Sequence, residues 1–524
     1  MSRQTSLQVE TAAALPAQTH ASETVAVGVF SDEPRLGAPD ALDAALRELC
    51  ERVTASGEFR GEEETTLTLH AAAGAGERAG GGDTGGEAVT DAGRGGADTG
   101  GAGARRVLLV GLGSHADFNA SALRRAAGAA VRAARQTRAL HFVAPPSGDD
   151  ARPALRALAE GAHLGLYDNG FYRKKDEAEA ARLERLTLVG AFGDEAGEEL
   201  ERARVVAESV NWARTLADEP GLSLPPVEFA RRAAEMAREF GLGVESLGAE
   251  EIRARGMGGL AGVAQGSEEE PALIVLRYEP EGASEDDELW AFVGKGITFD
   301  TGGISIKHGL DMYEMKSDMA GGAAALGALR AFARLKPDRR VVAVVPAAEN
   351  MPSGKSIKPG DIVRTFAGPT IECVDTDAEG RLVLVDGIAY AKHLGATRVV
   401  DLATLTGSIV VALGSHRAGL FSNDDDWANR VLAAAQAAGE PAWRMPVSDD
   451  YKKRIESMIA DFKNYGGRPD ATAAALLLSK FAGDTPWVHL DIAGTAWYDA
   501  PTAYAPKGAS GAGVRTLVEL VTAQ

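Results

Sequence analysis

Short apolar runs alternate with helix-like segments along most of this chain of 524 residues, and that alternation limits the fold more than any other feature. The apolar runs of the C-terminal part are PALIVLRY (271–278), LWAFVGKG (289–296), RRVVAVVPA (339–347) and TRVVDLATL (397–405). Runs that are apolar throughout predict strands buried on both faces, and strands separated by helices pair in parallel beneath those helices. We therefore expect an α/β fold. Ligands of open α/β sheets bind beyond the carboxyl ends of the strands, so functional residues are expected there.

The N-terminal part of the chain shows the same alternation. It contains the strand-like runs TLTLHA (66–71), RRVLLVGLGS (105–114) and RLTLVGAF (185–192), with Ala-rich helix-like segments between the last two. A long helical segment follows and ends at the Pro-Gly break at Pro220 and Gly221. We predict an N-terminal α/β domain at residues 1–195 and a larger C-terminal α/β domain at residues 196–524. The central sheet of the larger domain should be mixed, mostly parallel and flanked by helices.

A glycine-rich segment interrupts the N-terminal domain at residues 71–104. It reads AAAGAGERAGGGDTGGEAVTDAGRGGADTGGAGA and contains almost no large apolar side chain. Such a composition cannot bury enough apolar surface to form a core. We expect a flexible insertion between two strands of one domain.

The charge balance excludes several classes of partner. The chain has 55 Lys+Arg and 75 Asp+Glu, which gives a net charge of −20. No global positive field therefore draws it to nucleic acid or to anionic lipid. Cys50 and Cys373 are the only cysteines, too few for a disulfide framework, and no apolar stretch approaches the roughly 18 residues of a membrane span. The N-terminus also lacks the apolar core of a signal peptide, so we expect a soluble cytoplasmic protein.

One motif resembles a phosphate-binding loop without meeting its requirements. The segment ENMPSGKS ends in Gly354, Lys355 and Ser356, but Glu349 stands where the motif requires its first glycine. A carboxylate at that position opposes phosphate binding. We interpret the segment as an ordinary loop.

Two clusters of polar residues follow apolar strands. VGKGITFDTGGISIK and IECVDTDAEGRL contain Lys295, Asp300, Lys307, Asp375, Asp377, Glu379 and Arg381, and Asp318 lies between them, before a Gly/Ala-rich helix. In an extended segment, residues two apart share a face, so Asp377, Glu379 and Arg381 are expected to point the same way. Neighbouring carboxylates repel each other, and a bound cation would relieve that repulsion.

These clusters are either solvated loop charges or a cation site. Asp and Gly are common in turns, and one such cluster alone would not distinguish the two interpretations. Both clusters, however, follow strands of the buried type and supply several oxygen ligands. Together they favour a site for two divalent cations roughly 3.5–4 Å apart, a common arrangement for hydrolysis.

Several segments closely resemble the leucyl aminopeptidase family of cytosolic two-metal exopeptidases. They are VGKGITFDTGGISIK, MYEMKSDMAGGAAALGALRA, PAAENMPSGKSIKPGDIV, DTDAEGRLVLVDGIAYA, DLATLTGSIVVALG and HLDIAGTAW. The TDAEGRL core is highly specific, and the resemblance runs from Asn211 to the C-terminus. It implies that residues 196–524 form a catalytic domain that releases N-terminal amino acids from peptides, with manganese or zinc as the two ions.

The resemblance implies a role for each residue that matches the family pattern. The metal ligands would be Lys295, Asp300, Asp318, Asp377 and Glu379. Asp300 and Glu379 would contact both ions, Lys295 and Asp318 the more exchangeable ion, and Asp377 the other. Lys295 would have to bind as the neutral amine, whereas free lysine has a pKa of about 10.4, so metal loading should depend on pH.

Two cationic residues would complete the chemistry that the resemblance implies. Lys307 would polarise the scissile carbonyl and stabilise the tetrahedral oxyanion. Arg381 would hold a bicarbonate ion that acts as general base. The implied substrate pocket includes Met315, Ala378, Thr404, Leu405 and Gly407. The family also implies a homohexamer.

The sequence departs from the family pattern at Asp375, where the family usually has Asn. An additional carboxylate beside the substrate pocket adds negative charge near the side chain or the ammonium group of the substrate. Our hypothesis is that Asp375 shifts the preference from neutral, leucine-type residues toward basic N-terminal residues.

Three alternative functions are consistent with parts of the pattern. Some relatives of this family bind DNA as accessory proteins, but the net charge of −20 disfavours nucleic acid as a partner. A metal-binding scaffold without catalysis would not need Lys307 and Arg381. A different two-metal hydrolase would share the carboxylates but would not need a lysine ligand.

Overall fold

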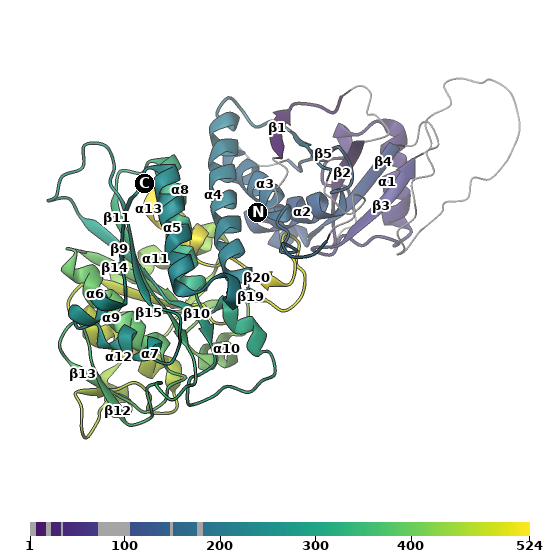
Figure 1. The fold of residues 1–524 in the computed structure, drawn as a ribbon. Helices are drawn as coiled ribbons and strands as arrows, with labels where there is room; N and C mark the ends of the chain where they lie inside the picture. Colours follow the sequence, from purple (N-terminus) through teal and green to yellow (C-terminus); the bar gives the residue numbers. More distant parts are fainter. Residues whose placement is uncertain are drawn as a thin grey trace, which may run out of the picture. The chain divides into compact units, whose positions relative to one another are not determined.

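The computed structural model describes residues 7–16, 23–32, 35–71, 105–146, 150–174 and 182–523. The chain forms two compact units: residues 1–207 with 501–506, and residues 208–500 with 507–524 (Figure 1). The predicted domain boundary at residue 195 falls at the start of helix α4 (Ala196–Asp218), whereas the units divide inside that helix. The predicted glycine-rich insertion, apart from Ala71, lies outside the described residues.

The first unit contains a six-stranded sheet with the order β1-β6-β5-β2-β4-β3. Its strands are β1 (Gln8–Ala12), β2 (Glu23–Phe30), β3 (Thr66–Ala71), β4 (Arg105–Gly113), β5 (Ala139–Val143) and β6 (Arg185–Val189). All neighbours pair in parallel except β3 and β4, which are antiparallel. The helices are α1 (Ala44–Ala55), α2 (Ala120–Ala133), α3 (Arg152–Gly165) and the first half of α4. The alternating pattern therefore predicted the α/β class of this unit, although β1, β2 and α1 were not among the predicted elements.

The second unit is built on a nine-stranded sheet. Its path is β16-β15-β18-β14-β9-β11-β8-β7, and β10 pairs with β11. The strands are β7 (Gly243–Leu247), β8 (Ala272–Tyr278), β9 (Leu289–Gly294), β10 (Gly296–Asp300), β11 (Arg340–Asn350), β14 (Arg398–Ala403), β15 (Ala418–Ser422), β16 (Ala442–Arg444) and β18 (Trp487–Asp491). The central strands β18, β14, β9 and β11 are parallel, and β7, β8 and β15 pair antiparallel to their inner neighbours. The predicted mixed, mostly parallel sheet is confirmed.

Two smaller sheets and a set of helices complete this unit. The smaller sheets contain β12 (Asp361–Arg364), β13 (Thr370–Cys373) and β17 (Phe462–Lys463), and β19 (Trp497–Tyr498) with β20 (Gly508–Ala509). The α-helices are α5 (Pro226–Phe240), α6 (Ala249–Ala254), α7 (Gly258–Ala264), α8 (Ala320–Leu335), α9 (Gly380–His393), α10 (Gly407–Leu413), α11 (Asp425–Ala438), α12 (Asp470–Ala482) and α13 (Val514–Thr522). Short 3₁₀ turns include η4 (Met312–Ser317) and η5 (Asp449–Arg454). None of the described helices has both the length and the apolar character that crossing a membrane requires.

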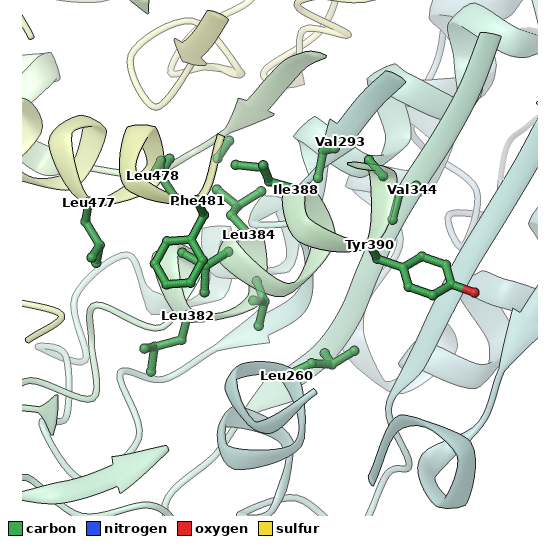
Figure 2. Close-up of a cluster of buried hydrophobic side chains, with 14 of the residues drawn as sticks. Leu260, Val293, Val344, Leu382, Leu384, Ile388, Tyr390, Leu477, Leu478 and Phe481 are labelled. Atoms are coloured by element: carbon green, nitrogen blue, oxygen red, sulfur yellow. The ribbon is translucent and has the colours of Figure 1, made fainter. Parts of the chain in front are cut away.

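Successive residues of a strand point to opposite sides of the sheet. Because strands such as β8 and β9 are apolar at nearly every position, both faces of the sheet are apolar, and helices cover both. On β9, Phe292 contacts Phe332 of α8, with ring centroids 6.2 Å apart, while Val293 belongs to the core on the α9 side. Figure 2 shows that core, which includes Leu260, Val293, Val344, Leu382, Leu384, Ile388, Tyr390, Leu477, Leu478 and Phe481. Full burial of one such side chain stabilises the fold by roughly 1.5–3 kcal/mol. This packing fixes the position of helix α9, which begins directly after Glu379 of the second polar cluster.

Candidate metal centre and active site

One half of the site is a buried lysine between two carboxylates. Lys295 lies between β9 and β10, Asp318 closes η4, and Glu379 immediately precedes α9. The Lys295 Nζ atom is 2.8 Å from Asp318 Oδ2 and 2.6 Å from Glu379 Oε1, and it donates to the carbonyl oxygen of Thr404 at 3.1 Å. All three charged residues are buried. Three distant parts of the sequence therefore meet at one point.

The other half of the site repeats this arrangement nearer to solvent. Lys307 Nζ lies 2.7 Å from Asp300 Oδ2 and 2.5 Å from Asp377 Oδ1. Asp300 is the last residue of β10 and is buried, whereas the side chains of Lys307 and Asp377 are 24% and 34% exposed. The Asn350 side-chain amide, at the end of β11, donates to Asp300 Oδ1 at 2.8 Å and fixes that carboxylate. This half can be reached from solvent.

The cluster is short of positive charge. Four carboxylates face two ammonium groups, which leaves an excess of two negative charges. Burial, with Asp300 nearby, raises the pKa of Glu379, and the same causes raise the pKa of Asp377 to about 6. Burial alone would lower the pKa of Lys295, but the carboxylates of Asp318 and Glu379 raise it above its ordinary value. The pKa values of Glu379, Asp377 and Lys295 are all shifted upward, which shows an environment that favours added positive charge.

The side chains present fit divalent cations. Asp300, Asp377 and Glu379 each offer one carboxylate oxygen, and these oxygens lie within 4.8 Å of one another. Glu379 Oε2 is buried and has no hydrogen-bond partner among the described residues. Buried carboxylate oxygens without a partner are costly unless a cation or a donor satisfies them. Oxygen ligands with one lysine nitrogen suit manganese or zinc better than a soft metal.

The expectation that Asp377, Glu379 and Arg381 point the same way holds for Asp377 and Glu379, whose carboxylate oxygens lie within 4.8 Å of each other, and is wrong for Arg381. It assumed an extended segment, but Glu379 has helical backbone angles (φ −73°, ψ −35°) and α9 begins at Gly380. Residues two apart on a helix are separated by roughly 200° around its axis. The Arg381 guanidinium instead contacts the carbonyl oxygen of Asn464 and the side chain of Asp470.

Arg381 nevertheless lies beside the turn that carries Asp377, residues 374–378, which we call the carboxylate turn. Its Nη1 atom donates to the carbonyl oxygen of Asn464 at 2.7 Å and to Asp470 Oδ1 at 3.0 Å. The residue is 2% exposed, and its Nε has no hydrogen-bond partner among the described residues. A buried guanidinium with an unused donor is suited to holding a small anion.

Three of the six predicted pocket residues, Met315, Thr404 and Leu405, lie around Asp318 and the loop after β14. Thr404 Oγ1 donates to Asp318 Oδ1 at 2.7 Å, and the Asp318 N–H donates to the carbonyl of Met315 at 3.2 Å. A Cβ at Gly380 would lie 2.8 Å from Lys295 Nζ and 2.9 Å from Leu405 Cδ1, so a larger residue here would displace these two side chains.

The remaining pocket predictions have different surroundings. Ala378 is buried and its carbonyl accepts from the Asn464 side chain. Asp375 Oδ1 accepts from the N–H of Asp377 at 2.9 Å. Gly407 is the first residue of α10, and a side chain there would meet open space, so it lies outside this contact network.

Three residues of the site were not predicted from the sequence. Asn350 and Asp491 end β11 and β18, and the rule that strand ends carry functional residues could have indicated both. Asp491 accepts from the N–H of Leu405 and from the hydroxyl of Thr406, and so holds the loop after β14. Asn464 follows the two-residue strand β17, where no periodicity marks it.

A cluster of carboxylates and lysines beside the strand ends of an α/β sheet is typical of metal-dependent hydrolases. Residues 211–518 match the catalytic domain of the cytosol aminopeptidase family, and residues 97–176 match the N-terminal domain of that family. The chain belongs to the cytosol aminopeptidase family and is a metal-dependent aminopeptidase. This confirms the resemblance inferred from its motifs.

Relatives and solved structures agree with this assignment. The chain is 46% identical over 439 residues to a probable cytosol aminopeptidase of Koribacter versatilis, covering 80% of this chain and 85% of the relative. It is 45% identical over 490 residues to one of Acidobacterium capsulatum, covering 91% and 90%. A mutant of tomato leucine aminopeptidase superposes with a TM-score of 0.83 at 30% identity, covering 100% of this chain and 98% of that one. The bottromycin maturation enzyme BotP in complex with Mn gives 0.79 at 34% identity, covering 96% and 99%.

Proposed function

We propose that this aminopeptidase removes leucine-type and basic N-terminal residues from peptides, with two manganese or zinc ions held by Lys295, Asp300, Asp318, Asp377 and Glu379. The observation that supports this most directly is the excess of buried carboxylate, with Glu379 Oε2 lacking a partner among the described residues. Divalent ions in such a site supply Lewis acidity and lower the pKa of bound water toward neutrality. The test is hydrolysis by metal-stripped protein, which should return only when manganese or zinc is added.

We assign the remaining chemistry to two cations of the chain. Lys307 lies in the half of the site that is open to solvent, where its ammonium can polarise a substrate carbonyl and stabilise the developing oxyanion. Arg381 has a buried Nε that can hold bicarbonate as the general base toward the attacking water. The Asn464 carbonyl and Asp470 orient this guanidinium from one side.

Asp375 provides a test of the substrate preference. Because its Oδ1 accepts from the Asp377 N–H, Asp375→Asn can keep that hydrogen bond while it removes the charge. Loss of a partly exposed carboxylate should lower the ratio of arginine-arylamide to leucine-arylamide hydrolysis roughly two- to fivefold. The measurement is kcat/KM on both substrates. The control is Asp361→Asn, at the first residue of strand β12. An unchanged ratio in Asp375→Asn would eliminate the charge hypothesis.

We propose a cytoplasmic homohexamer. The relatives are named cytosol aminopeptidases, which supports the location. Several large apolar side chains of the second unit are exposed, including Ile306 at 61%, Leu310 at 84% and Val411 at 91%, and assembly would bury surfaces of this kind. Light scattering should give a mass of about six times the 54.5 kDa of one chain, and a monomer would contradict the proposal.

A further inference from the structure

Asn464 lies beside the carboxylate turn because of strand pairing. Strand β17 pairs in parallel with β13, with Phe462 opposite Ile371 and Lys463 opposite Glu372. The ladder continues for one more hydrogen bond, from the Asn464 N–H to the Glu372 carbonyl at 2.9 Å. Where the ladder ends, the chain after β13 enters the turn that carries Asp377. Asn464 is 1% exposed at this point.

Beyond the ladder, the Asn464 side chain binds the main chain of the turn. Its Oδ1 accepts from the N–H groups of Val374 at 2.8 Å and Asp375 at 3.3 Å. Its Nδ2 donates to the carbonyls of Asp375 at 2.6 Å and Ala378 at 3.2 Å. One buried amide therefore fixes both ends of a turn of five residues. The use of both its donor and its acceptor edge requires an amide, because a carboxylate would turn an oxygen toward the two carbonyls.

The main chain of Asn464 acts on the same site from the other side. Its carbonyl oxygen accepts from Arg381 Nη1 at 2.7 Å. The residue thus connects the turn with Asp377, the start of α9 after Glu379, and the guanidinium of Arg381. Residues that orient metal ligands in this way typically change metal affinity or activity by about 10- to 100-fold when they are replaced.

We propose that Asn464 is a positioning residue that sets the direction of the Asp377 and Glu379 carboxylates and of Arg381. The proposal rests on the proposed role of those residues in holding cations and an anion. Asn464 contacts the turn through the main chain and touches no reacting atom in this assignment. Its replacement should therefore weaken cation binding even where the protein remains folded.

The test compares Asn464→Ala and Asn464→Asp with the matched control Asn423→Ala. The Asn423 side chain also makes three hydrogen bonds to main chain, with Gly483, Thr485 and Trp487, but these lie on another loop. Manganese affinity of the metal-stripped proteins, their thermal midpoints, and kcat and KM after loading are measured. We expect roughly 10- to 100-fold weaker manganese binding in both Asn464 variants and wild-type affinity in Asn423→Ala. We also expect kcat to fall more than KM rises.

Each outcome of this comparison is decisive. Wild-type manganese affinity in a folded Asn464→Asp or Asn464→Ala protein would overturn the proposal, whatever happens to the thermal midpoint. Equal loss of affinity in Asn423→Ala would also overturn it, because the effect would then be one of general destabilisation. If Asn464→Ala does not fold, Asn464→Asp decides, since it keeps the size and the Oδ1 acceptor. Absence of hydrolysis by the metal-loaded wild type would refute the proposed function, while the affinity comparison would still test Asn464.

Discussion

Replacement of Lys307 by alanine is expected to lower kcat/KM for amino-acid arylamides by roughly 10²- to 10³-fold, as loss of an oxyanion-stabilising group does in other hydrolases. The same change should leave cation binding intact or strengthen it. Lys307 is one of two positive charges among four carboxylates, 2.7 Å from Asp300 and 2.5 Å from Asp377, so its removal makes the cluster more negative. Steady-state kinetics and a manganese titration of the same protein measure the two effects.

The matched control for this lysine is Lys355→Ala. Lys355 has a side chain 74% exposed and pairs only weakly, at 3.4 Å, with the exposed Glu268. It belongs to the segment that superficially resembles a phosphate loop, and its replacement should change neither measurement. Hydrolysis by Lys307→Ala at the wild-type rate would remove Lys307 from the mechanism. Loss of both hydrolysis and manganese binding would instead give it a structural role.

Replacement of Glu379 by glutamine is expected to lower kcat/KM roughly 10³-fold, which corresponds to loss of several kcal/mol of metal-dependent stabilisation. The thermal midpoint of the metal-free protein should not fall, because the change relieves repulsion between carboxylates. Lys295 keeps its ion pair with Asp318, in which Nζ and Oδ2 are 2.8 Å apart. Wild-type protein should gain stability when manganese is added, since a ligand that binds the folded state raises its free energy of unfolding. That gain should be largely lost in the variant.

The control for Glu379 is Glu279→Gln, which removes an exposed carboxylate that pairs with Arg340. Kinetics and thermal unfolding with and without manganese provide both readouts. A Glu379→Gln protein that keeps the manganese-induced rise in midpoint would show that Glu379 is not a ligand. A large fall in the metal-free midpoint would show that Glu379 mainly supports the fold.

The sheet architecture was predictable because apolar burial is recorded locally in the sequence. The strand LWAFVG (289–294) has no polar position, and in the structure Phe292 and Val293 indeed face helices on opposite sides. Lys295 and Asp300 follow such runs, so their place at the strand ends could be predicted as well.

The internal geometry of the site was less predictable. The strand before Asp377 belongs to a small separate sheet, and the backbone becomes helical at Glu379, so the rule for extended segments does not apply to Arg381. Asn464 binds the turn from 86 to 90 residues away in the chain, and hydrogen bonds over that distance leave no periodic signal. The ligand assignments came from the family resemblance and not from residue spacing.

The proposed two-metal aminopeptidase function is tested most directly by hydrolysis of a panel of amino-acid arylamides by metal-stripped protein, before and after it is reloaded with manganese or zinc. We expect no hydrolysis without metal, and activity toward leucine-type or basic residues after reloading that is lost in the Lys307 and Glu379 variants. Activity that persists in the metal-free protein, or silence across the panel with metal demonstrably bound, would contradict this function.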